Sequence, residues 1–113
     1  MNILAINGSP RGAKGISHFL LDHFLIGARD AGAQAEVIQL AKEKIHHCTG
    51  EFHCWVKKQG VCLWDGKKGD TMRELRQKIA QADNLVLATP IYIDGMTGVM
   101  KNMFDRCIPN IYI

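Results

Sequence analysis

Hydrophobic and polar positions divide the chain into short apolar runs and longer stretches with a helical period. Residues 2–6 and 84–88 are almost wholly apolar, which is typical of strands covered on both faces of a sheet. Residues 35–40 alternate imperfectly, as a strand near a sheet edge does. Between the strands at residues 2–6 and 35–40, a helical period of apolar residues begins at Ile16 and ends near Gly32, a candidate left-handed cap. The pattern predicts a strand–helix–strand unit with parallel strands.

Three helices are expected, each with one apolar side. In the first helix, apolar residues recur at every fourth position, and we expect these to face the core: Ile16, Leu20, Phe24 and Ala28. The apolar face also takes in Phe19 and Leu21, so we expect it to be wide and well buried. A capping box formed by Thr71 and Glu74 is predicted to begin the second helix. Its apolar stripe indicates core packing: Met72, Leu75, Ile79 and Ala82. Thr97 is placed to cap a last helix. The apolar side of that helix is Val99, Met100, Met103, Phe104 and Cys107.

The turn after the first strand, residues 7–15, is rich in glycine and hydroxyl groups and leads directly into a helix. The free N–H groups and the dipole of a helix N-terminus favour an anion. Ser9 and Ser17 add hydroxyl donors, and Arg11 adds a fork that matches a phosphate. The glycines have the spacing of neither a dinucleotide fingerprint nor a P-loop. The turn therefore favours a phosphate monoester over a pyrophosphate.

A second loop, from Pro90 to Ile93, follows the strand at residues 84–88. Its residues Pro90, Ile91, Tyr92 and Ile93 offer an apolar wall with exposed backbone. In a doubly wound sheet of the flavodoxin-like order, the loops after the first and third strands lie side by side at the carboxyl edge, where ligands bind. A planar ring joined to a phosphate by a short polar tail would span both loops. FMN has that shape.

The composition argues against several other classes of protein. The chain has 113 residues, of which 47% are hydrophobic, so we expect one domain over residues 1–113. A net charge of +3, spread without an aromatic-interleaved basic stripe, does not indicate nucleic acid binding. No apolar run reaches membrane-spanning length, and the N-terminus lacks the pattern of a signal peptide. A cytoplasmic protein without a membrane partner is the expectation.

Residues 42–70 are the least regular part, and a loop of this length in a small domain is usually functional. It is rich in potential metal ligands: His46, His47, Cys48, His53, Cys54 and Cys62. One interpretation is a metal or cluster site, but none of the cysteines form a C-x-x-C pair. The other, which we favour, is that the cysteines are small packing residues and the histidines are exposed. Trp55 and Trp64 are expected to anchor the loop by apolar burial.

Several motifs together resemble a known family. They are Gly8-Ser9-Pro10-Arg11, Ile16-Ser17, the loop from Cys48 to Asp65, Ala88-Thr89-Pro90-Ile91-Tyr92, Gly95-Met96-Thr97 and the segment from Lys101 to Arg106. In this order they resemble the flavodoxin-like NADPH-dependent FMN reductases, and among these the branch that includes iron–sulfur flavoproteins. The resemblance implies a three-layer α/β/α fold with a parallel sheet.

The resemblance also implies site residues. In such proteins the Gly-Ser-Pro-Arg loop holds the FMN phosphate, which points here to Ser9, Arg11, Gly15, Ile16 and Ser17. The Thr-Pro-x-Tyr loop lies against the isoalloxazine ring, which points to Pro90, Ile91, Tyr92 and Ile93. Asp105 and Arg106 are expected to be structural. No residue is assigned as a catalytic acid or base, because the flavin carries the chemistry.

The chain departs from the family's pattern at three places. Many relatives have Asn-Thr or Asn-Ser where Ile16-Ser17 stands, so one side-chain donor is lost. Glu51 occupies the place of an intervening cysteine, so no iron–sulfur cluster or other metal is predicted. Relatives continue with two more strands, so the fold looks truncated at its C-terminus, with the expected strand order 2-1-3. The third strand is then an apolar edge, which we expect a second copy of the chain or a further segment to cover.

The implied function is an NAD(P)H-dependent oxidoreductase. NADPH, as co-substrate, would give a hydride to FMN, which would pass electrons to a small-molecule acceptor such as a quinone or free flavin. Two alternatives remain: an electron-transfer module without a substrate of its own, as simple flavodoxins are, and a non-catalytic truncated fragment.

Overall fold

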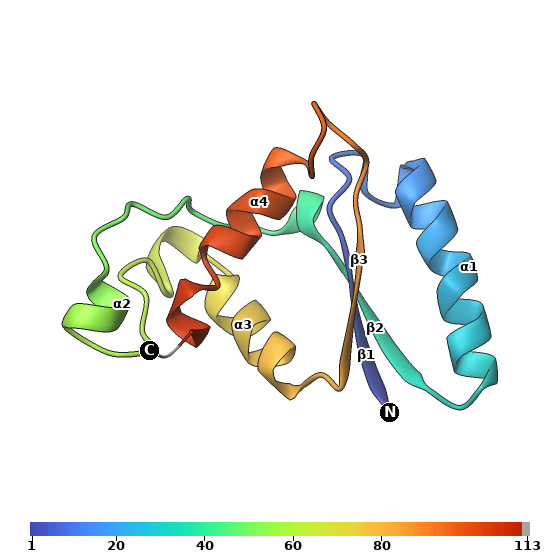
Figure 1. Cartoon of the computed structure of the whole chain (residues 1–113), viewed down its shortest axis with the longest axis horizontal. Helices are drawn as coiled ribbons and strands as arrows, with labels where there is room; N and C mark the ends of the chain where they lie inside the picture. Colours follow the sequence, from blue (N-terminus) through green and yellow to red (C-terminus); the bar gives the residue numbers. More distant parts are fainter. Residues whose placement is uncertain (112–113) are drawn as a thin grey trace.

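The computed structural model describes residues 1–111, so the last two residues of the predicted domain lie outside the described ones. A three-stranded parallel sheet has the order β2-β1-β3 (Figure 1). The strands are β1 (Asn2–Asn7), β2 (Gln34–Gln39) and β3 (Asn84–Ala88). The predicted order 2-1-3 is confirmed. β2 ends one residue earlier than the sequence suggested, because Leu40 begins a short 3-10 turn.

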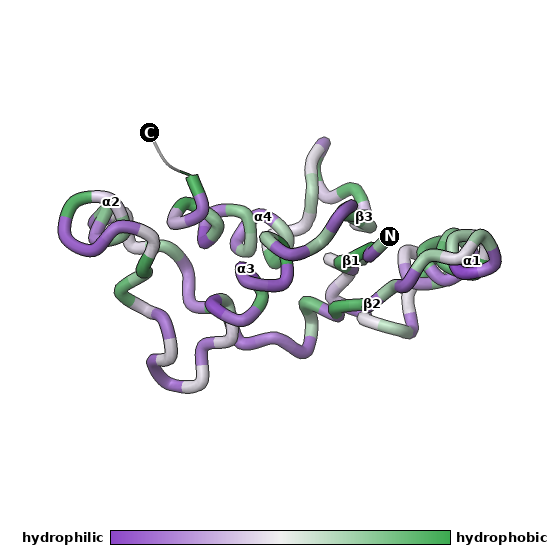
Figure 2. Tube along the Cα trace, turned by 90° about the horizontal axis from the view of Figure 1, so that it is seen from below, coloured by the Kyte–Doolittle hydropathy of each residue, from purple (hydrophilic) through white to green (hydrophobic). Residues whose placement is uncertain are grey.

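Helices cover both faces of the sheet, which confirms the flavodoxin-like three-layer fold. α1 (Ile16–Asp30) lies alone on one face, whereas α3 (Met72–Gln81) and α4 (Gly98–Asp105) lie on the other (Figures 1 and 2). The short α2 (His53–Val56) belongs to the long loop and projects away from the sheet (Figure 1). Four 3-10 turns complete the elements: Gly12–Lys14, Leu40–Lys42, Lys67–Gly69 and Ile108–Asn110.

Two apolar clusters form the core because successive side chains of β1 point to opposite faces. Leu4 and Ile6 belong to the larger cluster with α3 and α4, while Ile3 and Ala5 pack against α1. The stripe predicted for α3 is part of the larger cluster: Met72 and Leu75 are buried, and Ile79 and Ala82 pack partly buried against it. β1 is thus the buried centre, which fixes the position of the loop that follows it.

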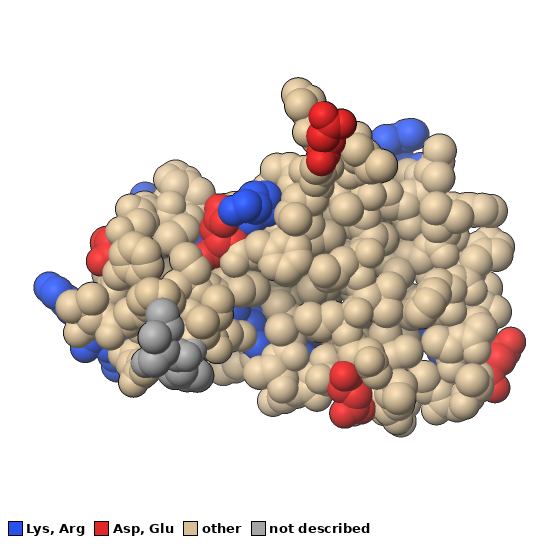
Figure 3. All heavy atoms as spheres, in the orientation of Figure 1, with Lys and Arg blue, Asp and Glu red and all other residues tan. Residues whose placement is uncertain are grey.

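The side of α1 that faces the core is only partly the predicted one. Leu21 is buried against the sheet and Ala28 packs partly buried beside it, as expected, but Leu25 is buried as well. The other predicted residues are between 56% and 75% exposed: Ile16, Phe19, Leu20 and Phe24. The helix carries large apolar residues around most of its circumference, so a fourth-residue period could not select the buried side. Figure 3 shows few charged groups on the visible surface on the α1 side of the molecule.

The predicted ends of the helices are confirmed at two places and corrected at a third. Gly32, with a φ of 97°, ends α1 in a Schellman motif, in which its N–H donates to Arg29 and that of Ala33 to Ala28. The Thr97 hydroxyl accepts the N–H of Met100 and caps α4 as expected.

The capping box at Thr71 and Glu74 is wrong, since no side-chain bond of Thr71 caps α3 within the described residues. Asp70 accepts the N–H of Met72 at 3.0 Å instead, and the Thr71 hydroxyl donates to Glu43. An aspartate one position earlier competes for the same N–H groups and adds a charge that the helix N-terminus favours.

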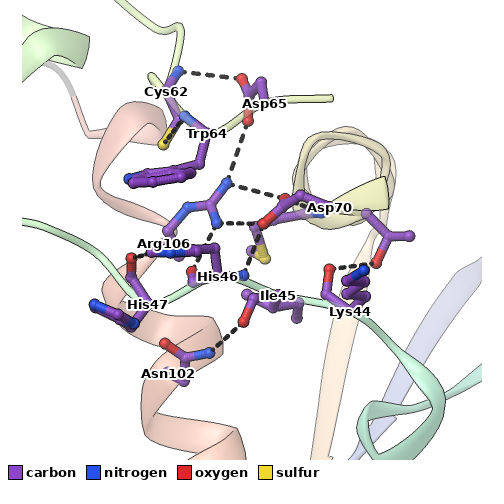
Figure 4. A network of polar contacts seen from close by, with 12 residues as sticks. Lys44, Ile45, His46, His47, Cys62, Trp64, Asp65, Asp70, Asn102 and Arg106 are labelled. Carbon is purple, nitrogen blue, oxygen red and sulfur yellow. Dashed lines mark hydrogen bonds and ion pairs between the residues drawn. The ribbon is translucent and has the colours of Figure 1, made fainter. Parts of the chain in front are cut away.

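A buried ion-pair network ties the long loop to α3 and α4 (Figure 4). Arg106, only 1% exposed, holds both oxygens of Asp70 at 2.7 and 3.1 Å and also contacts Asp65 at 3.4 Å. Arg76 pairs with Asp65 at 2.6 Å. Burial alone raises the pKa of Asp70, but Arg106 and two backbone N–H groups outweigh it and hold that pKa below its ordinary value. The structural role expected for Arg106 is confirmed.

The two tryptophans anchor the loop in different ways. Trp64 stacks on His46 with ring centroids 3.6 Å apart and planes 8° from parallel. Trp55 is 38% exposed, and its indole N–H donates to the carbonyl of Ile108 at 3.2 Å. The expected apolar burial is therefore partial, and polar contacts supply the rest.

The described residues contain no helix that is long and apolar enough to cross a membrane. Among them, β3 pairs only with β1, and its residues Leu85 and Leu87 are 44% and 42% exposed. The expectation that a second copy or a further segment covers this edge stays a prediction.

Candidate functional site

The turn after β1 is organised by Asn7, a fully buried side chain. Its amide nitrogen donates to the carbonyl of Gly12 at 3.1 Å and to the Gln39 side chain at 2.8 Å. Its amide oxygen accepts the N–H of Ser9 at 3.1 Å. One side chain thus connects both ends of the turn and the end of the neighbouring strand β2. We call residues 8–17 the phosphate loop.

Two of the predicted site residues, Ser9 and Gly15, are packed together inside the phosphate loop. The Ser9 side chain is 3% exposed, and its hydroxyl oxygen accepts the N–H of Arg11 at 3.2 Å. A Cβ on Gly15 would lie 2.9 Å from that oxygen, closer than real contacts allow. Glycine is therefore required here because a side chain has no space. The backbone conformation does not require it, because a φ of −94° is open to any residue.

The start of α1 presents backbone donors at the same place. Gly15 is its N-cap, and no side chain among the described residues caps it. The first helical bond runs from the N–H of Phe19 to Gly15, so the N–H groups of Ile16 and Ser17 precede the intrahelical bonds. Ile16 is 75% exposed and offers its backbone, while Ser17 is half-buried and adds a hydroxyl. These donors and the exposed Arg11 lie at one end of α1, where a helix N-terminus favours an anion, and they are the groups that could hold an oxyanion.

The second predicted loop stands out from the edge of the sheet as a tight hairpin (Figure 1). Tyr92 and Gly95 exchange both backbone hydrogen bonds, at 2.9 and 3.1 Å. The two residues between them, Ile93 and Asp94, have φ values of 45° and 60°, the signature of a type I′ turn. Ile91 and Ile93 are 82% and 99% exposed. The apolar side chains are therefore available to a ligand, and a β-branched residue is held in a strained conformation.

Thr97 and Thr89 connect the hairpin to the phosphate loop. The Thr97 hydroxyl, fully buried, donates to the carbonyl of Gly8 at 2.6 Å, and its backbone N–H donates to the Thr89 hydroxyl at 3.2 Å. The N–H of Gly8 also donates to the carbonyl of Ala88 at 2.7 Å. The structure thus brings the two predicted loops side by side at the carboxyl edge of β1 and β3.

Sequence reasoning identified both loops but missed two residues that shape them. The sequence places Asn7 in the turn and Gln39 in the second strand, and it predicts no contact between their side chains. The available signal was an amide residue directly after a wholly apolar strand and before a glycine, where a strand end needs partners for its last polar groups. Thr97 was found as a helix cap, but its bond to Gly8 was not foreseen.

The sequence profile of the NADPH-dependent FMN reductase family matches residues 1–111. The chain belongs to this family. The recognition made from the motifs is thereby confirmed.

Curated relatives agree with the family. The chain is 32% identical over 107 residues to an iron–sulfur flavoprotein of Methanocaldococcus jannaschii, covering 95% of this chain and 50% of that protein. It is 35% identical over 106 residues to an iron–sulfur flavoprotein of Archaeoglobus fulgidus, covering 94% and 48%. The chain therefore spans about half the length of the curated relatives that it matches.

Solved structures support the fold. A flavone reductase is 31% identical, with a TM-score of 0.68, over 94% of this chain and 29% of that one. An FMN-dependent NADH-azoreductase from Bacillus anthracis, solved in complex with FMN, has a TM-score of 0.70 over 94% of this chain and 55% of that one. At 20% identity the azoreductase shows the likeness of fold alone.

The names of the curated relatives raise the question of an iron–sulfur cluster. Cys48, Cys54 and Cys62 do line one small cavity together with Glu51. That cavity measures about 20 Å³, roughly the space of one water. In the part of the chain that the structure describes, no three ligand side chains are placed to hold a metal ion. As they stand, these residues do not fit an iron–sulfur cluster.

The surroundings of the thiols agree with the interpretation as packing residues. Cys54 is buried, and burial, with its neighbours Cys62 and Glu51, raises the pKa of its thiol. The Glu51 carboxylate is engaged by the Thr49 hydroxyl, which lowers its pKa. Cys48 accepts a backbone N–H from Gly50 at 3.4 Å.

Proposed function

We propose that this chain binds FMN non-covalently at the carboxyl edge of β1 and β3, as part of an NAD(P)H-dependent oxidoreductase. The observation that carries the proposal is the pairing of an oxyanion cradle with an exposed apolar hairpin on neighbouring strands. The FMN-complexed azoreductase of the same fold and the family's description support this cofactor.

The residues fit the phosphate end of FMN. The absence of a side chain at Gly15 lets the buried Ser9 hydroxyl pack against the start of α1, close to the N–H groups that would hold the phosphate. Backbone N–H groups of Ile16 and Ser17 and the Arg11 guanidinium donate to it, each as a charge-assisted hydrogen bond. The positive end of α1 adds a favourable field.

The hairpin is the proposed binding surface for the isoalloxazine ring of FMN. Pro90 and Ile91 offer apolar surface, while Tyr92 and Ile93 stand at the turn. With FMN bound, these side chains would position its ring and exclude water from it. The flavin would supply the redox chemistry between NADPH and an acceptor such as a quinone or free flavin. No residue of the chain needs to act as an acid or base in this scheme.

Because the chain spans only about half the length of its curated relatives, two other roles are also tested. The first is an electron-transfer module without its own substrate, and the second is a fragment whose function lies in assembly alone. We propose the reductase, with a second copy of the chain covering the edge of β3. Oxidation of NADPH by the FMN-loaded chain, followed at 340 nm, separates the reductase from the electron-transfer module.

FMN binding itself is tested by titrating the chain into FMN and following the quenching of flavin fluorescence. We expect saturation at one FMN per chain, and riboflavin, which lacks the phosphate, should bind at least about tenfold more weakly. The double variant Ser9→Ala and Arg11→Ala should weaken FMN binding by a similar factor. Arg29→Ala, at the opposite end of α1, is the matched control.

The proposal fails if the quenching of FMN fluorescence does not saturate, or if riboflavin and FMN bind equally well. It also fails if the double variant binds FMN as the unmodified chain does. Retained FMN binding without NADPH oxidation would leave the flavin site in place and favour the electron-transfer module.

A further inference from the structure

A cavity of about 450 Å³ lies between the long loop and the outer side of α3. This volume is within the range of sites that hold small molecules. Its lining includes Lys58 and Asp65 from the loop and Arg73 and Arg76 from α3. None of its lining residues belongs to the phosphate loop or to the hairpin, so the cavity is distinct from the proposed flavin site.

The charges around the cavity do not cancel. Asp65 is shared between Arg76 and Arg106, and Arg106 in turn is paired with Asp70, so these two guanidinium groups balance two carboxylates. Lys58 and Arg73 are exposed at the cavity, and neither forms an ion pair within residues 1–111. The cavity therefore carries a surplus of about two positive charges.

Arg76 supplies an unpaired donor at the same place. Its side chain is 5% exposed, and its Nη2 donates to Asp65 at 2.6 Å. Its Nη1 is buried and has no acceptor among the described residues. Arg76 lines the cavity, and a buried charged donor without an acceptor costs free energy, so a ligand that brings an acceptor to this guanidinium group would be favourable.

We propose that this cavity binds a small organic dianion, which presents a phosphate or carboxylate group to Arg76. The planar fork of arginine matches the oxygens of either group. Lys58 and Arg73 balance the second charge at the rim. The side-chain amides of Gln77 and Asn110, which also line the cavity, donate to or accept from the polar groups of the ligand.

The test is an NMR titration of the ¹⁵N-labelled chain at constant ionic strength. One arm uses glycerol phosphate and the other uses succinate, so that the two sources of the oxyanion are distinguished. We expect saturable shifts in the amides of residues 58–65 and 73–80 with at least one probe. Lys58→Gln and Arg73→Gln should each weaken that binding by about tenfold. Both positions are exposed, so neither change threatens the fold.

Two further variants make the result specific. Lys57→Gln removes an equal charge from the neighbouring exposed position, which does not line the cavity, and should leave the affinity unchanged. Arg11→Ala affects only the phosphate loop and should also leave it unchanged. The proposal is overturned if neither probe gives saturable shifts at these amides. It is also overturned if Lys57→Gln weakens binding as much as Arg73→Gln, or if Arg11→Ala abolishes it.

Discussion

Replacing Thr97 by valine tests whether one buried hydroxyl holds the two loops of the flavin site together. In the structure this hydroxyl donates to the carbonyl of Gly8 at 2.6 Å and accepts the N–H of Met100 at 3.3 Å. Valine has nearly the same shape, so little cavity forms, but both backbone groups lose their partner. The perturbation is therefore a loss of hydrogen bonds with the packing almost preserved.

The magnitude follows from the two groups that lose a partner. A buried carbonyl left without a donor costs about 1–3 kcal/mol. Loss of the helix N-cap costs about 1 kcal/mol. We expect Thr97→Val to lower the free energy of unfolding by about 2–4 kcal/mol in total. Thr97→Ser keeps the hydroxyl and loses only a methyl group, which should cost about 1 kcal/mol or less.

The assay is urea unfolding of the chain without FMN, followed by circular dichroism. Thr49→Val is the control, because it removes an exposed hydroxyl whose two partners, the Glu51 carboxylate and the Trp64 indole N–H, both lie at the surface, and it should change stability by about 1 kcal/mol or less. FMN titration of each folded variant then shows whether the loops have moved, and only the valine variant should bind more weakly. The reasoning is refuted if Thr97→Val is as stable as Thr97→Ser, or if its affinity for FMN is unchanged.

Three further predictions concern other parts of the same molecule. Because the folded-state pKa of Asp70 is lowered, its stabilising effect is present above its unfolded pKa, about 3.9, and is lost as pH falls through the lower folded value. Asp70→Asn should therefore destabilise the chain at neutral pH and flatten its acid unfolding curve below about pH 4, measured by circular dichroism. Ile93→Asn should raise the free energy of unfolding by about 1 kcal/mol in urea, since asparagine tolerates a positive φ. An unchanged urea midpoint would contradict that strain. Gly15→Ala should weaken FMN binding by about tenfold in a fluorescence titration, because its Cβ displaces the Ser9 hydroxyl. Equal affinity for FMN would show that the cradle tolerates the added methyl group.

Local chemistry made much of the fold predictable. The apolar runs at residues 2–6 and 84–88 predicted two strands, and both are present in the expected parallel order. Only the first is buried on both faces, because β3 lies at the edge of the sheet among the described residues and leaves Leu85 and Leu87 exposed. Gly32 is needed for its positive φ and Thr97 for its hydroxyl, so the sequence alone could place one helix end at each. In each of these cases the deciding interaction lies within a few residues of the chain.

The predictions that were wrong depend on partners distant in sequence. The buried side of α1 is chosen by the sheet, and Leu21 and Leu25 are as apolar as the exposed Leu20 and Phe24. Asp70 caps α3 while it also pairs with Arg106, 36 residues away, which no local motif could reveal. Propensity and periodicity cannot rank such alternatives, because tertiary contacts decide between them.

The candidate site depends both on local chemistry, which the sequence reveals, and on contacts between residues distant in sequence, which it does not. The phosphate loop could be found because glycine, serine and arginine types at a strand–helix junction have a chemical meaning. Its geometry could not be found, because it depends on the buried amide of Asn7, which contacts Gln39 on the neighbouring strand.

Buried polar groups such as Asn7 and Thr97 tolerate few arrangements, since each unsatisfied atom is costly. They therefore fix the position of the loops more tightly than apolar packing alone would. The hairpin has no comparable constraint at its tip, where Ile93 is almost fully exposed. At the proposed FMN site, the buried polar bonds are therefore at the phosphate end, and we expect substitutions there to lower the affinity for FMN more than substitutions at the exposed tip of the hairpin.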